Sequence, residues 1–296
     1  MRVVTLLPAA TEIVAALGGS GHLVGISHEC DYPQSVQGLP RVTTTPVDIR
    51  ASGAGIDAEV RRLREAGQPV VGIEIEQLRR LAPDLIITQD LCEVCAVADG
   101  QVHRLAQALA PPPRVLALEA RNLEEIWSDI RQVGTALDLE DEAEELVLGL
   151  ESRLGRIRAV RPPDTARVLC VEWLEPLYLA GHWVPELVEA AGGQDVGARP
   201  GSHSARREWG ELSGLRPDHV IVMLCGFGIK RARAELQSLA IPDALDLLRR
   251  VPVWILDGNA YTSRPGPRVV DGAARIQAAI RGRPASGLER WHPSRS

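Results

Sequence analysis

The sequence predicts an α/β protein with two lobes, each built on a parallel sheet, and a long rigid helix that joins them. In both halves of the chain, short apolar runs rich in β-branched residues alternate with amphipathic helical stretches, which is typical of parallel-sheet architecture. Between the halves, residues 122–158 carry helical periodicity and almost no strand signal. The 296 residues, 45% of them hydrophobic, are enough to form two separate cores.

The first lobe is expected over residues 1–121. Thr11 and Glu12 after Pro8 favour a helix start, and Gly18-Gly19 favours the end of the same helix. The strands that we expect in this lobe are 3–7, 23–27, 85–88 and 114–118. The helices that we expect are 11–17, 56–66, 75–81 and 99–109.

The spanning helix is expected within residues 122–160, as one long helix preceded by a shorter one. Asp138 and Asp141 favour a restart between the two, and Arg161-Pro162-Pro163 ends the second. The apolar positions at helical spacing are Leu123, Ile126, Ile130, Val133, Leu137, Ala143, Leu146, Val147, Leu150, Leu154 and Ile157.

The second lobe is expected over residues 161–280, where the alternation of strands and helices resumes. Residues 78–87 and 212–221 share one pattern, in which a helix ends, Pro-Asp forms a turn and a buried strand begins. This echo at matching points of the two halves indicates a duplication. Residues 281–296 lack periodicity and are expected to form a loose tail. The strands expected in the second lobe are 167–172, 219–224 and 253–256.

Composition and motifs exclude several classes of function. The net charge of −6 provides no basic surface for nucleic acid, and no segment approaches the roughly 18 apolar residues of a membrane span. The chain has no Gly-x-Ser-x-Gly elbow, no phosphate-binding Gly-x-x-x-x-Gly-Lys loop and no His-Glu-x-x-His helix. We therefore expect a monomeric binding protein and not an enzyme.

The N-terminus bears on where the protein works. Met1-Arg2 leads directly into the apolar run Val3-Val4-Thr5-Leu6-Leu7, which Pro8 ends. This run predicts a buried strand, whereas a signal peptide needs an apolar stretch of about 7–15 residues and a cleavage site. As written, the chain is expected to stay in the cytoplasm, and a start codon farther upstream would make it extracytoplasmic.

The opening of the chain carries a distinctive motif. Residues 3–13, Val-Val-Thr-Leu-Leu-Pro-Ala-Ala-Thr-Glu-Ile, are followed by Val24-Gly25-Ile26-Ser27 and by Asp31-Tyr32-Pro33. Together they resemble the opening of class III periplasmic binding proteins of ABC importers, in particular the cobalamin-binding branch. The resemblance implies two α/β lobes, a rigid spanning helix and a ligand cleft between the lobes. It resumes at residues 76–87, 176–193 and 265–270, with a departure between 43 and 71.

The resemblance also implies ligand-binding residues. Tyr32, beside Asp31, matches the tyrosine of the family's cleft loop, and Tyr261 falls where the family carries an aromatic residue. A flat ring suits the broad apolar face of a corrin, since it buries much area with little loss of rotamer entropy. The alternative for both tyrosines is that they only brace loops. Three tryptophans in loop-like stretches are further candidates for either ligand contact or packing: Trp173, Trp183 and Trp209.

A transporter partner is implied through two surface glutamates, one per lobe, that dock such proteins on arginines of the permease. Glu76 fits the first position. The second position is occupied by Gly210, which is flanked by Glu208 and Glu211. Either of these two carboxylates could take the place of the second docking glutamate. The glycine at the position itself departs from the family pattern and weakens the expectation of an ABC transporter permease as partner.

Two thiol loops depart from the better-known cobalamin binders. His28 and Cys30 follow one expected strand, and Cys92 and Cys95 follow another. One imidazole and three thiols suit zinc or an iron–sulfur cluster, and Cys-x-x-Cys is also the spacing of a redox pair. Packing and loop shaping are a third alternative. A fourth is coordination of a corrinoid cobalt by His28 or a thiolate.

The function that we expect is reversible binding of cobalamin or a related corrinoid in the cleft between the lobes. The protein would serve as a carrier or as the substrate-binding component of an ABC importer. One alternative is an iron-chelate binder, for a siderophore or haem. Another is a metal or redox protein that uses the loop of Cys92 and Cys95.

Overall fold

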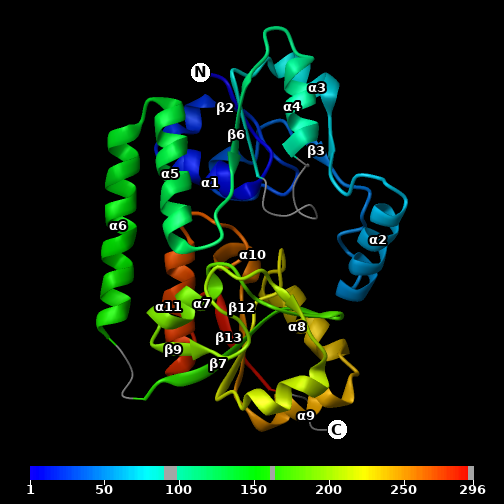
Figure 1. Cartoon of the computed structure of the whole chain (residues 1–296), viewed down its shortest axis with the longest axis vertical. Coiled ribbons are helices and arrows are strands. Elements are labelled where there is room, and N and C mark those ends of the chain that lie inside the picture. Colours follow the sequence, from blue (N-terminus) through cyan, green and yellow to red (C-terminus); the bar gives the residue numbers. More distant parts are fainter. Residues whose placement is uncertain (90–98, 161–163, 293–296) are drawn as a thin grey trace. The chain divides into compact units, whose positions relative to one another are not determined.

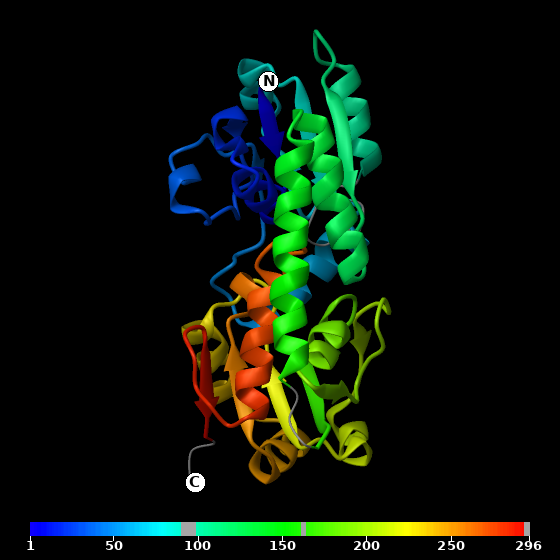
Figure 2. The same ribbon diagram turned by 90° about the vertical axis from the view of Figure 1, so that its left-hand side faces the viewer.

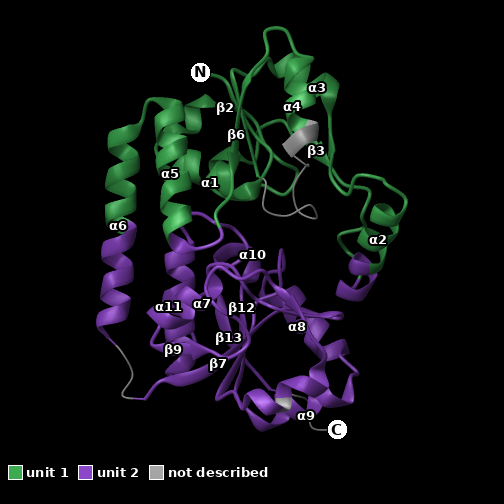
Figure 3. Cartoon of the chain, in the orientation of Figure 1, with its two compact units in different colours: residues 1–51, 58–120, 124–149 green, residues 52–57, 121–123, 150–296 purple. Residues whose placement is uncertain are grey.

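The computed structural model describes residues 1–89, 99–160 and 164–292 (Figure 1). The chain divides into two compact units, neither of which is one continuous run of sequence (Figure 3). Unit 1 comprises Met1–Ala51, Ala58–Ala120 and Glu124–Gly149. Unit 2 comprises Ser52–Asp57, Arg121–Leu123 and Leu150–Ser296.

Unit 1 is built on a four-stranded parallel sheet. In spatial order its strands are β2 (Leu23–Gly25), β1 (Val3–Thr5), β5 (Leu85–Gln89) and β6 (Arg114–Leu118). Val3 lies opposite Leu23 on one side and Leu85 on the other. All three residues of β1 are buried, which is typical of a central parallel strand. A separate antiparallel pair is formed by β3 (Thr43–Thr44) and β4 (Gly72–Ile73).

The helices of unit 1 begin and end at residues that suit those positions. Pro8 is the first residue of α1, where its fixed φ is compatible with the helix and its missing N–H costs nothing. Gly18, at φ 78°, follows the same helix in the left-handed conformation that glycine tolerates best. The helices are α1 (Pro8–Ala16), α3 (Ile75–Leu81), α4 (Asp99–Gln107) and α5 (Leu123–Leu137), with 3₁₀ turns η1 (Gly19–His22) and η2 (Gln34–Val36).

Three helices contribute residues to both units. Unit 2 contains the opening residues of α2 (Gly53–Glu65), the first residue of α5 (Leu123) and the second half of α6 (Glu140–Ala159). Within unit 1, α5 lies beside the first half of α6, and Arg131 pairs with Glu144 at 2.8 Å (Figures 1 and 2). Within unit 2, Arg153 pairs with Asp271 at 2.5 Å.

Unit 2 is built on a mixed sheet with a parallel centre. In spatial order its strands are β10 (Ala205–Arg206), β8 (Leu177–Leu179), β7 (Ala166–Leu174), β11 (His219–Val222), β12 (Val253–Leu256) and β13 (Leu288–Trp291), and β9 (Gly193–Asp195) also pairs with β7. The pairs of β7 with β11 and of β11 with β12 are parallel. β13 pairs with β12 in the antiparallel direction, so this part of the expected loose tail is a strand. Leu288 and Trp291 are buried, so side-chain packing stabilises this strand although the sequence around it shows no periodicity.

Helices flank this second sheet, and α7 and α11 pack against each other. The core of unit 2 includes Trp209, Phe227 and Trp291 beside aliphatic residues of the central strands. The helices are α7 (Val184–Ala190), α8 (Ile229–Ser238), α9 (Pro242–Arg250), α10 (Gly258–Tyr261) and α11 (Val269–Ile280), with the 3₁₀ turn η3 (Trp209–Leu215).

The expected fold class is confirmed, since each unit carries a sheet with parallel central strands covered by helices. Among the described helices, none combines the length and the apolar character needed to cross a membrane.

Candidate functional site

The carboxyl ends of the parallel strands of unit 1 lead into the loops that the sequence indicated. Residues 26–33 follow β2 and carry His28, Cys30, Asp31 and Tyr32. In open α/β sheets, this edge is where ligands bind. The loop after β5 includes Cys92 and Cys95, which lie outside the described residues.

A single arginine fixes the backbone of the loop after β2. The Arg41 guanidinium donates hydrogen bonds to the carbonyls of Ser27, at 2.9 Å, and Cys30, at 2.5 Å. The side chain of Gln37 donates to the Asp31 carbonyl at 2.8 Å. Tyr32 is 47% exposed although it belongs to this fixed loop. The loop therefore presents an aromatic side chain to solvent from an ordered backbone.

His28 is held by one hydroxyl. Its backbone N–H donates to Thr43 Oγ1 at 2.9 Å, and its ring Nδ1 lies 2.6 Å from the same oxygen. Burial and, secondly, the nearby Arg41 charge lower the pKa of His28 below its ordinary value. The imidazole is therefore neutral at pH 7, the form that binds metals.

Cys30 points into the unit and not out of the loop. Its side chain is 1% exposed, and its Sγ lies 3.0 Å from Thr11 Oγ1, which in turn lies 2.6 Å from Thr5 Oγ1. This geometry fits a packing role for the thiol. Within the described parts of the chain, no three His, Cys, Asp or Glu side chains cluster as a metal site would require. The metal hypothesis that includes Cys92 and Cys95 stays a prediction.

Two of the candidate tryptophans in unit 2 are buried and tie loops to the core. The Trp183 Nε1–H donates to the carbonyl of Thr262 at 2.9 Å, and the Trp209 Nε1–H donates to that of Leu174 at 3.1 Å. Both indoles are 5% exposed. Their geometry fits the packing alternative, in which they position the loops at the carboxyl ends of β7 and β12.

Trp173 forms an aromatic pair with Phe227, the only phenylalanine in the sequence. Their ring centroids are 5.2 Å apart, and the Arg231 guanidinium lies 3.7 Å from the Phe227 centroid. Gly53 packs against the indole, since a Cβ there would lie 3.4 Å from it, and its N–H donates to Glu235 at 3.0 Å. Among the described residues, the buried Trp173 Nε1 has no hydrogen-bond partner.

Tyr261 is packed on two sides. The Arg275 guanidinium lies 3.9 Å from its ring centroid and donates to its hydroxyl at 3.1 Å. A Cβ on Gly287 would lie only 2.4 Å from the ring, so the close approach requires glycine. The ring is half-buried, and its contact with a ligand stays a prediction.

Arg264 is a residue that the sequence reasoning missed. It lies in the segment after α10, is 6% exposed, and donates to the Asn259 side chain at 2.8 Å. A buried guanidinium is costly unless it is well paired, and the Asn259 side-chain oxygen is one of the partners of Arg264. The sequence feature that could have identified Arg264 is its position immediately before residues 265–270, where the family resemblance resumes.

The candidate docking glutamates are exposed. Glu76 is near the start of α3 and pairs with Arg79 at 2.6 Å. Glu208 precedes η3, and Glu211 approaches Arg207 at 3.9 Å. Exposed ion pairs of this kind contribute little free energy, so these carboxylates remain available to a partner.

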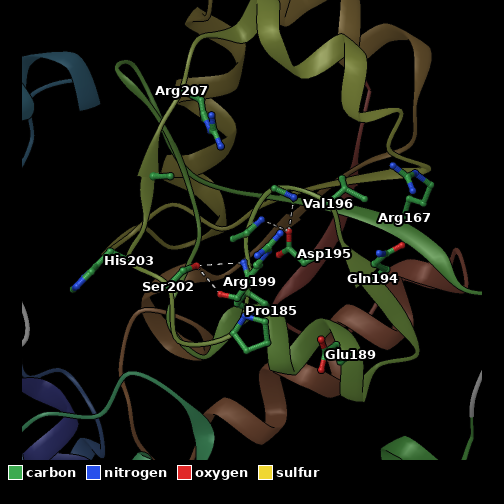
Figure 4. Close-up of a pocket in the computed structure, with 14 residues that line it drawn as sticks. Arg167, Pro185, Glu189, Gln194, Asp195, Val196, Arg199, Ser202, His203 and Arg207 are labelled. Carbon is green, nitrogen blue, oxygen red and sulfur yellow. Dashed lines mark hydrogen bonds between the residues drawn. The ribbon is translucent and has the colours of Figure 1, made fainter.

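A cavity in unit 2 lies beside β9 and is lined by none of the candidate residues (Figure 4). Its volume is about 680 Å³, and it is lined by Arg167, Asp195, Arg199 and His203 among others. None of the aromatic, acidic or thiol candidates from the sequence lines it. We therefore place the candidate site at the strand ends, where the loops carry exposed and pre-positioned side chains.

Comparison with known proteins adds a family. Residues 3–245 match the family model described as periplasmic binding protein. The vitamin B12-binding protein of Pectobacterium carotovorum subsp. carotovorum (strain PC1) is 24% identical, over 93% of this chain and 86% of that protein. An uncharacterized ABC transporter substrate-binding lipoprotein of Bacillus subtilis (strain 168) is 25% identical, over 94% and 79%. A solved periplasmic heme binding protein from Pseudomonas aeruginosa superposes with a TM-score of 0.72 at 22% identity, over 99% of each chain.

Proposed function

The chain belongs to the periplasmic binding protein family, and we propose that it binds cobalamin or a related corrinoid reversibly. Membership makes it a binding protein and not an enzyme. The observation that carries the ligand proposal is the loop after β2, which contains both the exposed Tyr32 and the neutral imidazole of His28. A relative that matches 93% of the chain is named a vitamin B12-binding protein, which supports the same ligand class.

Haem is the second candidate, because a structure with the same fold is named a periplasmic heme binding protein. A haem carries acidic side chains, whereas the corrin periphery carries mostly amides. The buried Arg264 at the carboxyl end of β12 is a residue that acidic side chains would favour. Both candidates are flat metal tetrapyrroles, so an exposed aromatic ring suits either of them.

The proposed partner is an ABC transporter permease, since one relative is named an ABC transporter substrate-binding lipoprotein. Glu76 in unit 1 and Glu208 or Glu211 in unit 2 are the carboxylates that we expect to dock on permease arginines. The family and this relative do not support the cytoplasmic location that the N-terminus indicated. We therefore expect the protein to work outside the cytoplasmic membrane, and fractionation of cells that produce it tests this location.

The ligand proposal is tested by calorimetric titration with cyanocobalamin, cyanoaquocobinamide, hemin and ferrichrome. Saturable binding of the two corrinoids at micromolar concentration or below, with weaker binding of hemin and ferrichrome, is the expected result. Hemin bound more tightly than both corrinoids would favour the second candidate. If no corrinoid binds at micromolar concentration, the leading proposal is wrong.

A further inference from the structure

The hydroxyl of Thr43 fixes the tautomer of His28. Thr43 Oγ1 accepts the backbone N–H of His28 at 2.9 Å and donates its own proton to Ser27 Oγ at 3.2 Å. A threonine hydroxyl has only one proton to donate. The 2.6 Å contact between Thr43 Oγ1 and His28 Nδ1 is therefore a bond in which the ring Nδ1–H is the donor.

This assignment leaves the lone pair on His28 Nε2. In a neutral imidazole one nitrogen is protonated and the other is an acceptor or a metal ligand. Among the described residues, no hydrogen bond to Nε2 is formed, whereas Nδ1 is fully engaged. A ring N–H that donates to a protein oxygen, with the opposite nitrogen open, is the usual arrangement of a metal-binding histidine.

The residues that hold the His28 imidazole are themselves fixed in the fold. Thr43 is 1% exposed and belongs to β3, where it lies opposite Ile73 of β4. On the other side, Arg41 holds the carbonyls that flank His28, those of Ser27 and Cys30. When the residues that orient a metal-binding histidine are held in this way, the imidazole is in position before the metal binds.

We infer that His28 Nε2 is an axial ligand of the metal in the bound tetrapyrrole and that Thr43 is its positioning residue. The inference rests on the proposed function and narrows its substrate class to tetrapyrroles with an exchangeable axial position. On binding, the bond from the metal to a water oxygen breaks and a bond from the metal to Nε2 forms. The water leaves, no electron is transferred, and the oxidation state of the metal is unchanged.

The test is titration with cyanoaquocobinamide, a corrinoid that has one labile water and no nucleotide base of its own. Calorimetry reports binding, and visible absorption reports the axial ligand. We expect the wild-type protein to shift the absorption bands from those of the aquo form to those of an imidazole complex. His28→Ala should bind without this shift. His22→Ala is the control, because this histidine belongs to η1 and contacts the Met1 carbonyl, and it should behave as wild type.

Thr43→Val tests the positioning role separately. It preserves the shape of the side chain and removes the hydroxyl, so the shift should persist while the affinity falls by about 10–100-fold, as for other supporting partners of metal ligands. Should His28→Ala fail to fold, His28→Gln retains an N–H donor for Thr43 and lacks the ring nitrogen.

Two results would overturn the inference: wild-type binding with no band shift, or a shift that persists in both His28 variants. Absence of binding to all corrinoids and hemin would instead contradict the proposed function.

Discussion

The Nε1–H of Trp183 donates a 2.9 Å hydrogen bond to the carbonyl of Thr262, 79 residues farther along the chain. Trp183 caps the start of α7, and Thr262 directly follows α10. Both residues are at most 5% exposed. The bond therefore fixes the segment after β12 that also carries Arg264, without exposing the indole to a ligand.

Trp183→Phe should destabilise the protein by about 1–3 kcal/mol beyond the loss of packing, because it leaves a buried carbonyl unpaired. Trp254→Phe is the matched control, since Trp254 is also buried in unit 2 but its Nε1 has no partner among the described residues. Urea denaturation measures both free energies of unfolding. Equal losses in the two variants would contradict a specific role for the bond.

Tyr32→Ala should weaken ligand binding and leave the free energy of unfolding almost unchanged. A side chain that is 47% exposed contributes little to the core, so the change in stability should stay within about 0.5 kcal/mol. Loss of an aromatic anchor costs about 2 kcal/mol of binding free energy, roughly 30-fold in Kd. Calorimetric titration measures the affinity, and Ile75→Ala, another exposed apolar residue of unit 1, should leave it unchanged. An affinity for Tyr32→Ala equal to that of wild type would remove this residue from the site.

Replacing two glycines by alanine, one in α5 and one in α6, should change the free energy of unfolding in opposite directions. A Cβ on Gly134 would lie 2.4 Å from the Cβ of Ala143, so Gly134→Ala should destabilise by about 1–3 kcal/mol through overpacking. Gly149 in α6 has open space around a new Cβ, so Gly149→Ala should stabilise by about 1 kcal/mol through helix propensity. Thermal denaturation measures both, and shifts of the same sign would show that α5 and α6 are not packed as described.

Asp129 should make the stability of the protein depend on pH. Burial raises its pKa to about 6, partly opposed by the N–H groups of Ala120 and Glu119, and the charges of Glu119 and Glu125 raise it further. The folded state therefore holds a proton that the unfolded state has lost between pH 6 and about pH 4. Stability rises as the pH falls through this window, by on the order of 3 kcal/mol for this group.

Asp129→Asn removes this contribution, so the difference in free energy of unfolding between wild type and variant should change across the window. Urea denaturation at pH 7, 6, 5 and 4 measures it. Asp195, whose pKa burial also raises to about 6, is present in both proteins and cancels in the difference. A constant difference over these pH values would show that Asp129 is not buried as a titrating carboxyl.

The central parallel strands of both sheets and the helices of the first lobe could be predicted because local patterns determine them. The helix expected at 75–81 has those bounds, and the one expected at 11–17 begins earlier, at Pro8, because proline is well suited to the first helical position. The expected loose tail instead contains β13. A short strand that depends on pairing with β12 has no periodic signal of its own.

The site was predictable where a residue follows a strand and not where its role depends on a distant partner. His28 could be named because it comes after a buried strand, and Tyr32 because its loop resembles the cleft loop of the family. The hydroxyl that orients His28 comes from Thr43, and the parallel bridge between Ile26 and Arg41 brings this residue beside the loop after β2. Similarly, the inward direction of Trp183 depends on the Thr262 carbonyl, which no local pattern indicates.

Each unit is made of several separate segments of the chain, so neither can be obtained as a single continuous fragment. A fragment that starts at Leu150 would lack Ser52–Asp57, the segment that covers Trp173 and satisfies Glu235. Such a fragment would expose an indole and a carboxylate that the intact chain keeps covered, and its affinity for a flat ligand would report an artificial surface. Ligand binding by one half of this protein therefore has to be studied by substitutions in the intact chain and not by truncation.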